Sequence, residues 1–218
     1  MSEQQEGRFP ARRWLARCGG AVVVAAGIAT FLGAPAAPAK DDKAEKVSKE
    51  EVAKVIADWP AVPKEVGTKM IEKYGPPNEA TPTHLVWDNN GPWKWSKLYK
   101  KETPHNFPVK HTDVLDQAID YKVPEKMVSP LAVFDGAVTV RITRGELSAM
   151  CDKEDMNFLA LNLAHEIITG KKNVEEVRAF QAKTVKAYLK GEKHEYTQKF
   201  IFEVPKGGTG YPDHEAKE

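Results

Sequence analysis

Residues 137–150 read AVTVRITRGELSAM and carry the clearest secondary-structure signal in the chain. Apolar side chains alternate with polar ones over 138–142, which is the period of two expected for a strand with one buried face. The turn pair Arg144-Gly145 then leads into a second run of the same kind. The stretch therefore predicts a β-hairpin of two antiparallel strands.

A second hairpin is predicted upstream, where two aromatic-rich runs, 83–87 and 93–99, flank the turn sequence DNNGP. Asn and Gly tolerate the backbone conformations of tight turns, and aromatic residues are enriched in strands. We therefore expect Trp87, Trp93 and Trp95 to form an aromatic ladder across these strands. Such a ladder is either a binding surface for a ligand or protein partner, or a part of the core that a helix covers.

Helix signals mark five further segments through capping residues, apolar residues at helical spacing and glycine or proline stops. These segments are 48–58, 63–74, 113–121, 152–169 and 173–190. Ser48 with Glu51 and Asn173 with Glu176 have the spacing of capping boxes. The broad apolar surface of segment 152–169 places that helix at the centre of the core.

The order of these elements predicts an α+β fold with an antiparallel sheet, because the chain lacks the strand–helix alternation of a parallel sheet. The sheet consists of the two hairpins plus a C-terminal strand at 199–204, packed against the two long C-terminal helices and the short N-terminal helix pair. Residues 48–205 are expected to form this single domain, and residues 206–218 a flexible tail.

One part of the chain resembles a known family. Residues 48–100 contain a helix that ends at Gly75-Pro76-Pro77 before an aromatic hairpin, a pattern similar to the small two-helix, three-strand lipoprotein of the outer-membrane assembly machinery. The resemblance covers this segment alone and carries no catalytic motif.

Residues 1–39 predict an export signal. Arg12 and Arg13 lie in a basic segment that precedes a long uncharged stretch rich in Ala, Gly and Val. The paired arginines resemble the twin-arginine export signal. Small residues before Lys40 fit cleavage by signal peptidase after Ala39. We therefore expect a periplasmic or secreted protein.

The same segment leaves an alternative open. The uncharged stretch, residues 18–39, is long enough to cross a bilayer as an uncleaved anchor, although its Gly and Pro residues weaken such a helix. After cleavage, the signal peptide gives only a transient membrane contact, and residues 40–47 form a charged linker. Removal of residues 1–39, with four Arg and two Glu, changes the formal net charge from +1 to −1. No nucleic-acid partner is expected at that charge.

The chain has no strong catalytic motif, such as a Walker loop, an HExxH zinc motif or a GxSxG nucleophile motif. His165-Glu166 lacks the second histidine of HExxH, so we expect His165 to be a half-buried core residue. Cys151 is a candidate nucleophile at a helix start, but its acidic neighbours disfavour the thiolate. These observations favour a protein without enzymatic activity.

The segment with the most chemical potential is 105–113, HNFPVKHTD. His105, His111 and Asp113 are candidate ligands of a transition metal, because imidazole and carboxylate groups suit zinc, copper and iron. Two alternatives are acid/base catalysis and a structural role in which His111 and Asp113 start a helix. No other cofactor is predicted.

Three functions follow from the sequence. The favoured one is an exported, non-catalytic domain that binds a small ligand or protein partner through the aromatic hairpin and segment 105–113. The alternative is an exported metalloprotein or enzyme that uses His105, His111 and Asp113. The third is a membrane-tethered structural module. The identity of the ligand or reaction, the export route and the oligomeric state are left open.

Overall fold

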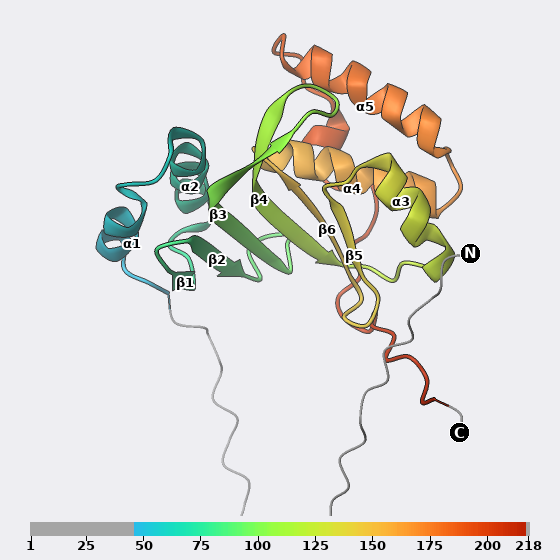
Figure 1. Ribbon diagram of the computed structural model, residues 1–218, viewed down its shortest axis with the longest axis horizontal. Coiled ribbons are helices and arrows are strands. Elements are labelled where there is room, and N and C mark those ends of the chain that lie inside the picture. Colours follow the sequence, from blue (N-terminus) through green and yellow to red (C-terminus); the bar gives the residue numbers. More distant parts are fainter. Residues whose placement is uncertain (1–45, 217–218) are drawn as a thin grey trace, which may run out of the picture. The chain divides into compact units, whose positions relative to one another are not determined.

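The computed structural model describes residues 46–216. These residues form one six-stranded antiparallel sheet with helices packed against it (Figure 1). Along the sheet the strands follow the order β1–β2–β3–β4–β6–β5. They are β1 (Glu79–Ala80), β2 (His84–Asp88), β3 (Trp95–His105), β4 (His111–Asp120), β5 (Val138–Arg141) and β6 (Glu146–Cys151). The two predicted hairpins are β2–β3 and β5–β6, and the α+β class with an antiparallel sheet is confirmed.

Within residues 46–216, five α-helices and two short 3₁₀ turns complete the fold. They are α1 (Lys49–Ile56), α2 (Ala61–Tyr74), η1 (Glu125–Met127), α3 (Val128–Phe134), α4 (Glu154–Ile168), α5 (Val174–Tyr188) and η2 (Glu195–Thr197). Figure 1 shows α1 and α2 beside the β1–β2–β3 part of the sheet, and α3, α4 and α5 beside the β6–β5 part. Helix α4 packs on β6 and β4, and α5 packs on α3 and α4.

The core of the described part of the chain consists of two hydrophobic clusters. One lies between α1, α2 and strands β2 to β4, and contains the fully buried Trp87. The other surrounds α4, and contains the almost fully buried Trp93. Tyr74 at the end of α2 donates a hydrogen bond of 2.6 Å to Glu154 at the start of α4, so the two clusters meet where these helices touch.

Both capping boxes are confirmed. The Ser48 side chain accepts a hydrogen bond from the Glu51 backbone at the start of α1, and the Glu51 carboxylate accepts one in return. Asn173 and Glu176 make the same exchange at the start of α5. These reciprocal bonds satisfy N–H groups that the first helical turn leaves free.

The predicted helix over 113–121 is wrong, because this segment is strand β4. Every residue from 113 to 119 is buried, since β4 lies between β3 and β6. A strand that is buried on both faces carries apolar residues without strict alternation. In this case the apolar pairs Val114-Leu115 and Ala118-Ile119 recur at a spacing that imitates a helix.

The predicted C-terminal strand at 199–204 is also absent, since this segment contains bends and joins no sheet in the structure of residues 46–216. Its Phe200 and Phe202 pack against the α4 cluster. The side chain of Asn162 on α4 bonds to the backbone of this segment. Its Nδ2 donates to Lys199 O at 2.8 Å, and its Oδ1 accepts from Ile201 N at 2.9 Å. A side chain thus supplies the hydrogen bonds that a neighbouring strand was expected to provide.

The segment after Pro205 contacts the turn between β5 and β6. The Thr209 hydroxyl donates a hydrogen bond of 2.7 Å to Gly145 O, and Tyr211 N donates one of 3.2 Å to Ile142 O. Gly145 has a φ of +64°, and a Cβ atom there would lie 2.2 Å from the backbone of Thr209. Glycine therefore permits this close contact.

The predicted export features, Arg12, Arg13, Ala39 and Lys40, lie outside the described residues. Across residues 46–216, no helix combines the length and the apolar character needed to cross a membrane.

Candidate metal site

His105, His111 and Asp113 come together on one face of the β3–β4 hairpin. His105 and His111 are paired across the two strands, and Asp113 lies two residues beyond His111. Paired residues in a sheet, and residues two apart on one strand, point to the same face. The strand geometry therefore brings together three side chains that were expected to lie on a loop and a helix start.

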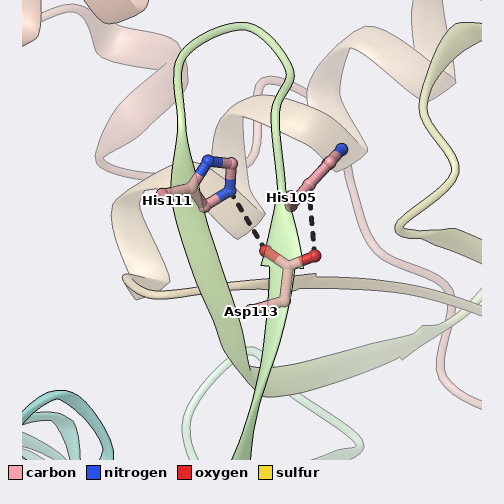
Figure 2. Close-up of side chains that lie close together, drawn as sticks. All are labelled: His105, His111 and Asp113. Atoms are coloured by element: carbon pink, nitrogen blue, oxygen red, sulfur yellow. Dashed lines mark ion pairs between the residues drawn. The ribbon is translucent and has the colours of Figure 1, made fainter.

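The Asp113 carboxylate lies between the two imidazole rings (Figure 2). His105 Nδ1 is 3.1 Å from Asp113 Oδ2, and His111 Nε2 is 3.1 Å from Asp113 Oδ1. One donor atom from each of the three residues lies within 4.8 Å of the other two. Asp113 is only 4% exposed, so the carboxylate is held away from solvent.

The second nitrogen of each ring also faces an oxygen. His111 Nδ1 is 2.8 Å from Val109 O, and His105 Nε2 is 3.5 Å from Asp135 Oδ1. A neutral imidazole has one N–H and one lone pair, so one nitrogen of each neutral ring would face an oxygen lone pair. This unfavourable contact is relieved when the ring gains a proton or when a metal ion lies between nitrogen and oxygen.

The protonation of His111 reflects this arrangement. The Asp113 carboxylate, and then the Cys151 thiol, raise the pKa of His111 to about 11. A metal ion would have to displace the proton from the ring, because only neutral imidazole is a ligand.

Hydrogen bonding within the cluster is incomplete. His105 Nδ1 and Asp113 Oδ1 are buried, yet among residues 46–216 neither has a hydrogen bond of acceptable geometry. The 3.1 Å contacts of these two atoms with Asp113 Oδ2 and His111 Nε2 therefore lack the alignment of a hydrogen bond.

A cavity of about 310 Å³ lies next to His105 and His111. The tip of the β3–β4 hairpin forms one wall, and strands β5 and β6 with helices α4 and α5 form the others. The tip is fixed to α5 by the Arg178 guanidinium, which lies 3.7 Å from the centre of the Phe107 ring. His105 and His111 both line this cavity, so a molecule inside it can reach them.

No family model, curated protein or solved structure matches this chain. The resemblance of residues 48–100 to the outer-membrane assembly lipoprotein gains no support from these comparisons. Functional inference for this protein therefore depends on the arrangement of its own residues.

The predicted aromatic surface is not exposed. Trp87, Trp93 and Trp95 are at most 7% exposed, and Trp87 and Trp93 belong to different core clusters. Lys97 and Arg141 cover the Trp95 ring, at 5.3 and 5.1 Å from its centre. This placement agrees with the alternative that the aromatic residues belong to the core, and it keeps them away from His105 and His111.

Cys151 lines the cavity, and it is a free cysteine in the part of the chain that the structure describes. Burial raises the pKa of its thiol, although the nearby His111 acts in the opposite direction. The thiol therefore stays protonated near neutral pH and is a poor nucleophile.

His165 is a core residue, as expected. Its Nδ1 is 2.8 Å from the Tyr121 hydroxyl, and its ring stacks on Phe202 with 4.1 Å between centres. Burial lowers the pKa of His165, so the ring is neutral.

Three polar residues of the site were missed by the sequence analysis. Asp135, Asn157 and Gln181 line the cavity but come from the end of α3, from α4 and from α5. Each is separated from segment 105–113 by at least one complete helix or strand, and no local motif marks it. Their position became visible only through the packing of these elements.

Proposed function

We propose that this protein is an exported metal-binding protein in which His105, His111 and Asp113 bind one transition-metal ion. Two imidazole nitrogens and a carboxylate oxygen suit Zn²⁺, and also Cu²⁺ and Fe²⁺. Zn²⁺ is the first ion to test, because it takes such ligands in tetrahedral geometry. Three protein ligands leave one position of a tetrahedral ion open to water or to an added ligand.

The observation that carries the proposal is the pair of buried atoms without hydrogen bonds, His105 Nδ1 and Asp113 Oδ1. A buried polar atom without a partner costs about 1–3 kcal/mol. Coordination of one cation by both residues would remove this cost, and the cation would replace the His111 proton as the charge that neutralises the buried carboxylate.

The groups behind the ligands support the same proposal. In metal sites, a ligating histidine usually donates its other N–H to a carbonyl or carboxylate oxygen, which fixes the ring and its tautomer. Val109 O and Asp135 Oδ1 have these positions behind His111 and His105. Both rings are therefore oriented before an ion arrives.

Export is the second part of the proposal and rests on the sequence of residues 1–39. The mass of the protein isolated from a bacterial host tests it. Lys40 as the first residue would support cleavage after Ala39, whereas an intact N-terminus would favour the membrane-tethered alternative. Replacement of Arg12 and Arg13 by lysine should block export if the twin-arginine route is used.

The metal-binding test uses the mature chain, purified without chelator and analysed by elemental mass spectrometry and by calorimetric titration of Zn²⁺ into the metal-free protein. We expect one ion per chain. Because His111→Ala removes a ligand, its effect should exceed the 10–100-fold loss typical of changes behind the ligands, so Zn²⁺ affinity should fall by more than about 100-fold.

His84→Ala is the matched control, since His84 is a half-buried strand histidine that contacts Thr81 and Thr83 and takes no part in the cluster. It should bind Zn²⁺ like the wild type. Circular dichroism shows whether each variant is folded. Absence of stoichiometric binding in the folded wild-type protein, for Zn²⁺, Cu²⁺ and Fe²⁺ alike, would overturn the proposal.

A further inference from the structure

We infer that the cavity beside His105 and His111 binds a small, largely apolar molecule that donates hydrogen bonds, such as a primary amide with a ring or chain as its body. The inference adds a ligand to the site described above. It rests on the cavity's own residues, and only a contact between this ligand and the metal ion depends on the proposed function.

The size of the cavity sets the size of the ligand. Its volume is about 310 Å³. A closed apolar cavity of about 150 Å³ is enough to bind benzene. The cavity in this protein is therefore large enough for a molecule of about two fused rings.

The walls define the apolar part of the ligand. Aliphatic side chains from both strands and both helices line the cavity: Val138, Ala149, Met156, Ala160, Val185 and Leu189. Ligand pockets usually combine such an apolar lining with a few polar groups that set the orientation of the ligand. The lining thus favours an apolar body over a sugar or a phosphate.

Two buried side chains define the polar part. Asn157 is fully buried, and its Nδ2 donates to Leu115 O at 2.9 Å and to Gln117 Oε1 at 3.0 Å. Gln181 is 6% exposed, and its Nε2 donates to Asp135 Oδ2 at 3.2 Å. These bonds fix which end of each amide is the donor and leave the two carbonyl oxygens for other partners.

Both carbonyl oxygens, Asn157 Oδ1 and Gln181 Oε1, are buried without a hydrogen-bond partner in residues 46–216, and both residues line the cavity. In this structure neither oxygen has appreciable accessible surface, so each amide must turn slightly before a ligand atom in the cavity can reach it. Since the free groups are acceptors, the matching ligand group is a donor. An amide N–H or a hydroxyl fits them, whereas an ester, a ketone or a hydrocarbon would leave both oxygens unpaired.

The same residues connect the cavity to the candidate metal site. Asp135 accepts from Gln181 through Oδ2, and its Oδ1 lies 3.5 Å from His105 Nε2. A ligand that bonds to Gln181 therefore lies one residue away from the imidazole of His105. The polar end of the ligand is expected at this side of the cavity.

The test compares two probes of nearly the same shape, naphthamide and acetonaphthone, by calorimetric titration into the mature protein. The amide has two N–H donors, and the methyl ketone has none. We expect naphthamide to bind with micromolar affinity and acetonaphthone to bind about 10-fold more weakly. Equal affinities would overturn the inference about hydrogen bonding, and no binding of either probe would overturn the cavity ligand altogether.

Variants locate the binding. Gln181→Met keeps the approximate size of the side chain, and should weaken naphthamide by about 10-fold while leaving acetonaphthone unchanged. Ala160→Phe fills the cavity from α4 and should remove binding of both probes. Ala179→Phe is the control, because Ala179 is exposed on α5 and does not line the cavity. Loss of binding in this control, or retention in Ala160→Phe, would place the probes elsewhere and overturn the inference.

Titration with EDTA and with saturating Zn²⁺ separates the two proposals. Naphthamide should bind in both conditions, because its partners are protein side chains. Binding of Zn²⁺ without binding of naphthamide overturns the cavity inference and leaves the metal site. Binding of naphthamide without binding of Zn²⁺ overturns the proposed metal site and leaves the cavity inference.

Discussion

Two carboxylates of this protein, the partly buried Glu154 and the buried Asp113, differ in how completely their oxygens are bonded. Glu154, at the start of α4, accepts hydrogen bonds at Oε1 from Tyr74 and Trp93, each at 2.6 Å, and from Gln117 at 3.3 Å. Its Oε2 pairs with Lys73. Asp113 faces two imidazole rings, and its Oδ1 has no aligned donor in residues 46–216.

The difference distinguishes a carboxylate that holds the fold from one that is available to a ligand. Donors from α2, the β2–β3 turn and β4 meet at Glu154 and join the two core clusters. The three side chains of the Asp113 cluster come from β3 and β4, and two of their buried polar atoms, His105 Nδ1 and Asp113 Oδ1, have no hydrogen-bond partner within residues 46–216. Substitutions should therefore affect stability at the first carboxylate and metal affinity at the second.

The largest effect is expected for Glu154→Ala. Tyr74, Trp93 and Gln117 would lose a shared acceptor, so the free energy of unfolding should fall by about 3 kcal/mol. Urea denaturation measures this change. Zn²⁺ affinity should stay within about twofold of the wild type, because no metal ligand is altered. A stability loss below about 1 kcal/mol would show that Glu154 is not the structural carboxylate described above.

Asp113→Asn should lower metal affinity. The amide keeps the shape of the side chain but loses its charge, so Zn²⁺ affinity should fall by more than about 100-fold. Differential scanning calorimetry with and without Zn²⁺ measures the effect: the ion should raise the Tm of the wild type and leave that of the variant unchanged. An equal rise in both would contradict a ligand role for Asp113.

A smaller loss is expected for Asp135→Asn. Asp135 lies behind His105 and orients its ring, so Zn²⁺ affinity should fall by about 10-fold. Calorimetric titration distinguishes this intermediate value from the larger loss in Asp113→Asn. If the two variants lost affinity equally, Asp135 would be a direct ligand.

The smallest effect concerns a second fully bonded carboxylate, Glu166. Burial alone would raise its pKa, but Lys172 and Tyr196 outweigh burial and hold the pKa below 4.5. A lowered pKa contributes stability that is present above pH 4.5 and is lost as the pH falls through the folded-state pKa.

Glu166→Gln should therefore cost about 1 kcal/mol at pH 7 and less in acid. Urea denaturation of both proteins at several pH values measures the difference. A constant difference from pH 7 to pH 3 would contradict a lowered pKa at this residue. Lys193→Gln, a change at an exposed lysine beyond α5, is a control for a change of one charge.

Much of the fold is predictable where the local pattern and the final environment agree. Apolar and polar residues alternate along the β5–β6 hairpin, and the capping boxes of α1 and α5 are complete within four residues. Strand β4 could not be recognised in this way. Its burial on both faces is a property of the assembled sheet, and it removes the alternation that identifies a strand.

The candidate site also has residues that the sequence predicts and residues that only the packing reveals. His105, His111 and Asp113 lie within one segment of nine residues, so their chemistry was visible in the sequence even though the predicted helix was wrong. Asn157 and Gln181 lie on α4 and α5, where polar residues on a helix have many roles. Only the packing of these helices against the hairpin shows that they share a cavity.

The shortness of the ligand segment affects how metal binding would be linked to folding. All three proposed ligands lie on one hairpin, and bringing its arms together closes a loop of only a few residues at low entropic cost. The unfolded chain would therefore retain some affinity for the ion. Binding to the unfolded state reduces the stabilisation that a metal gives to the native state, so the increase in unfolding free energy should be smaller than the binding free energy.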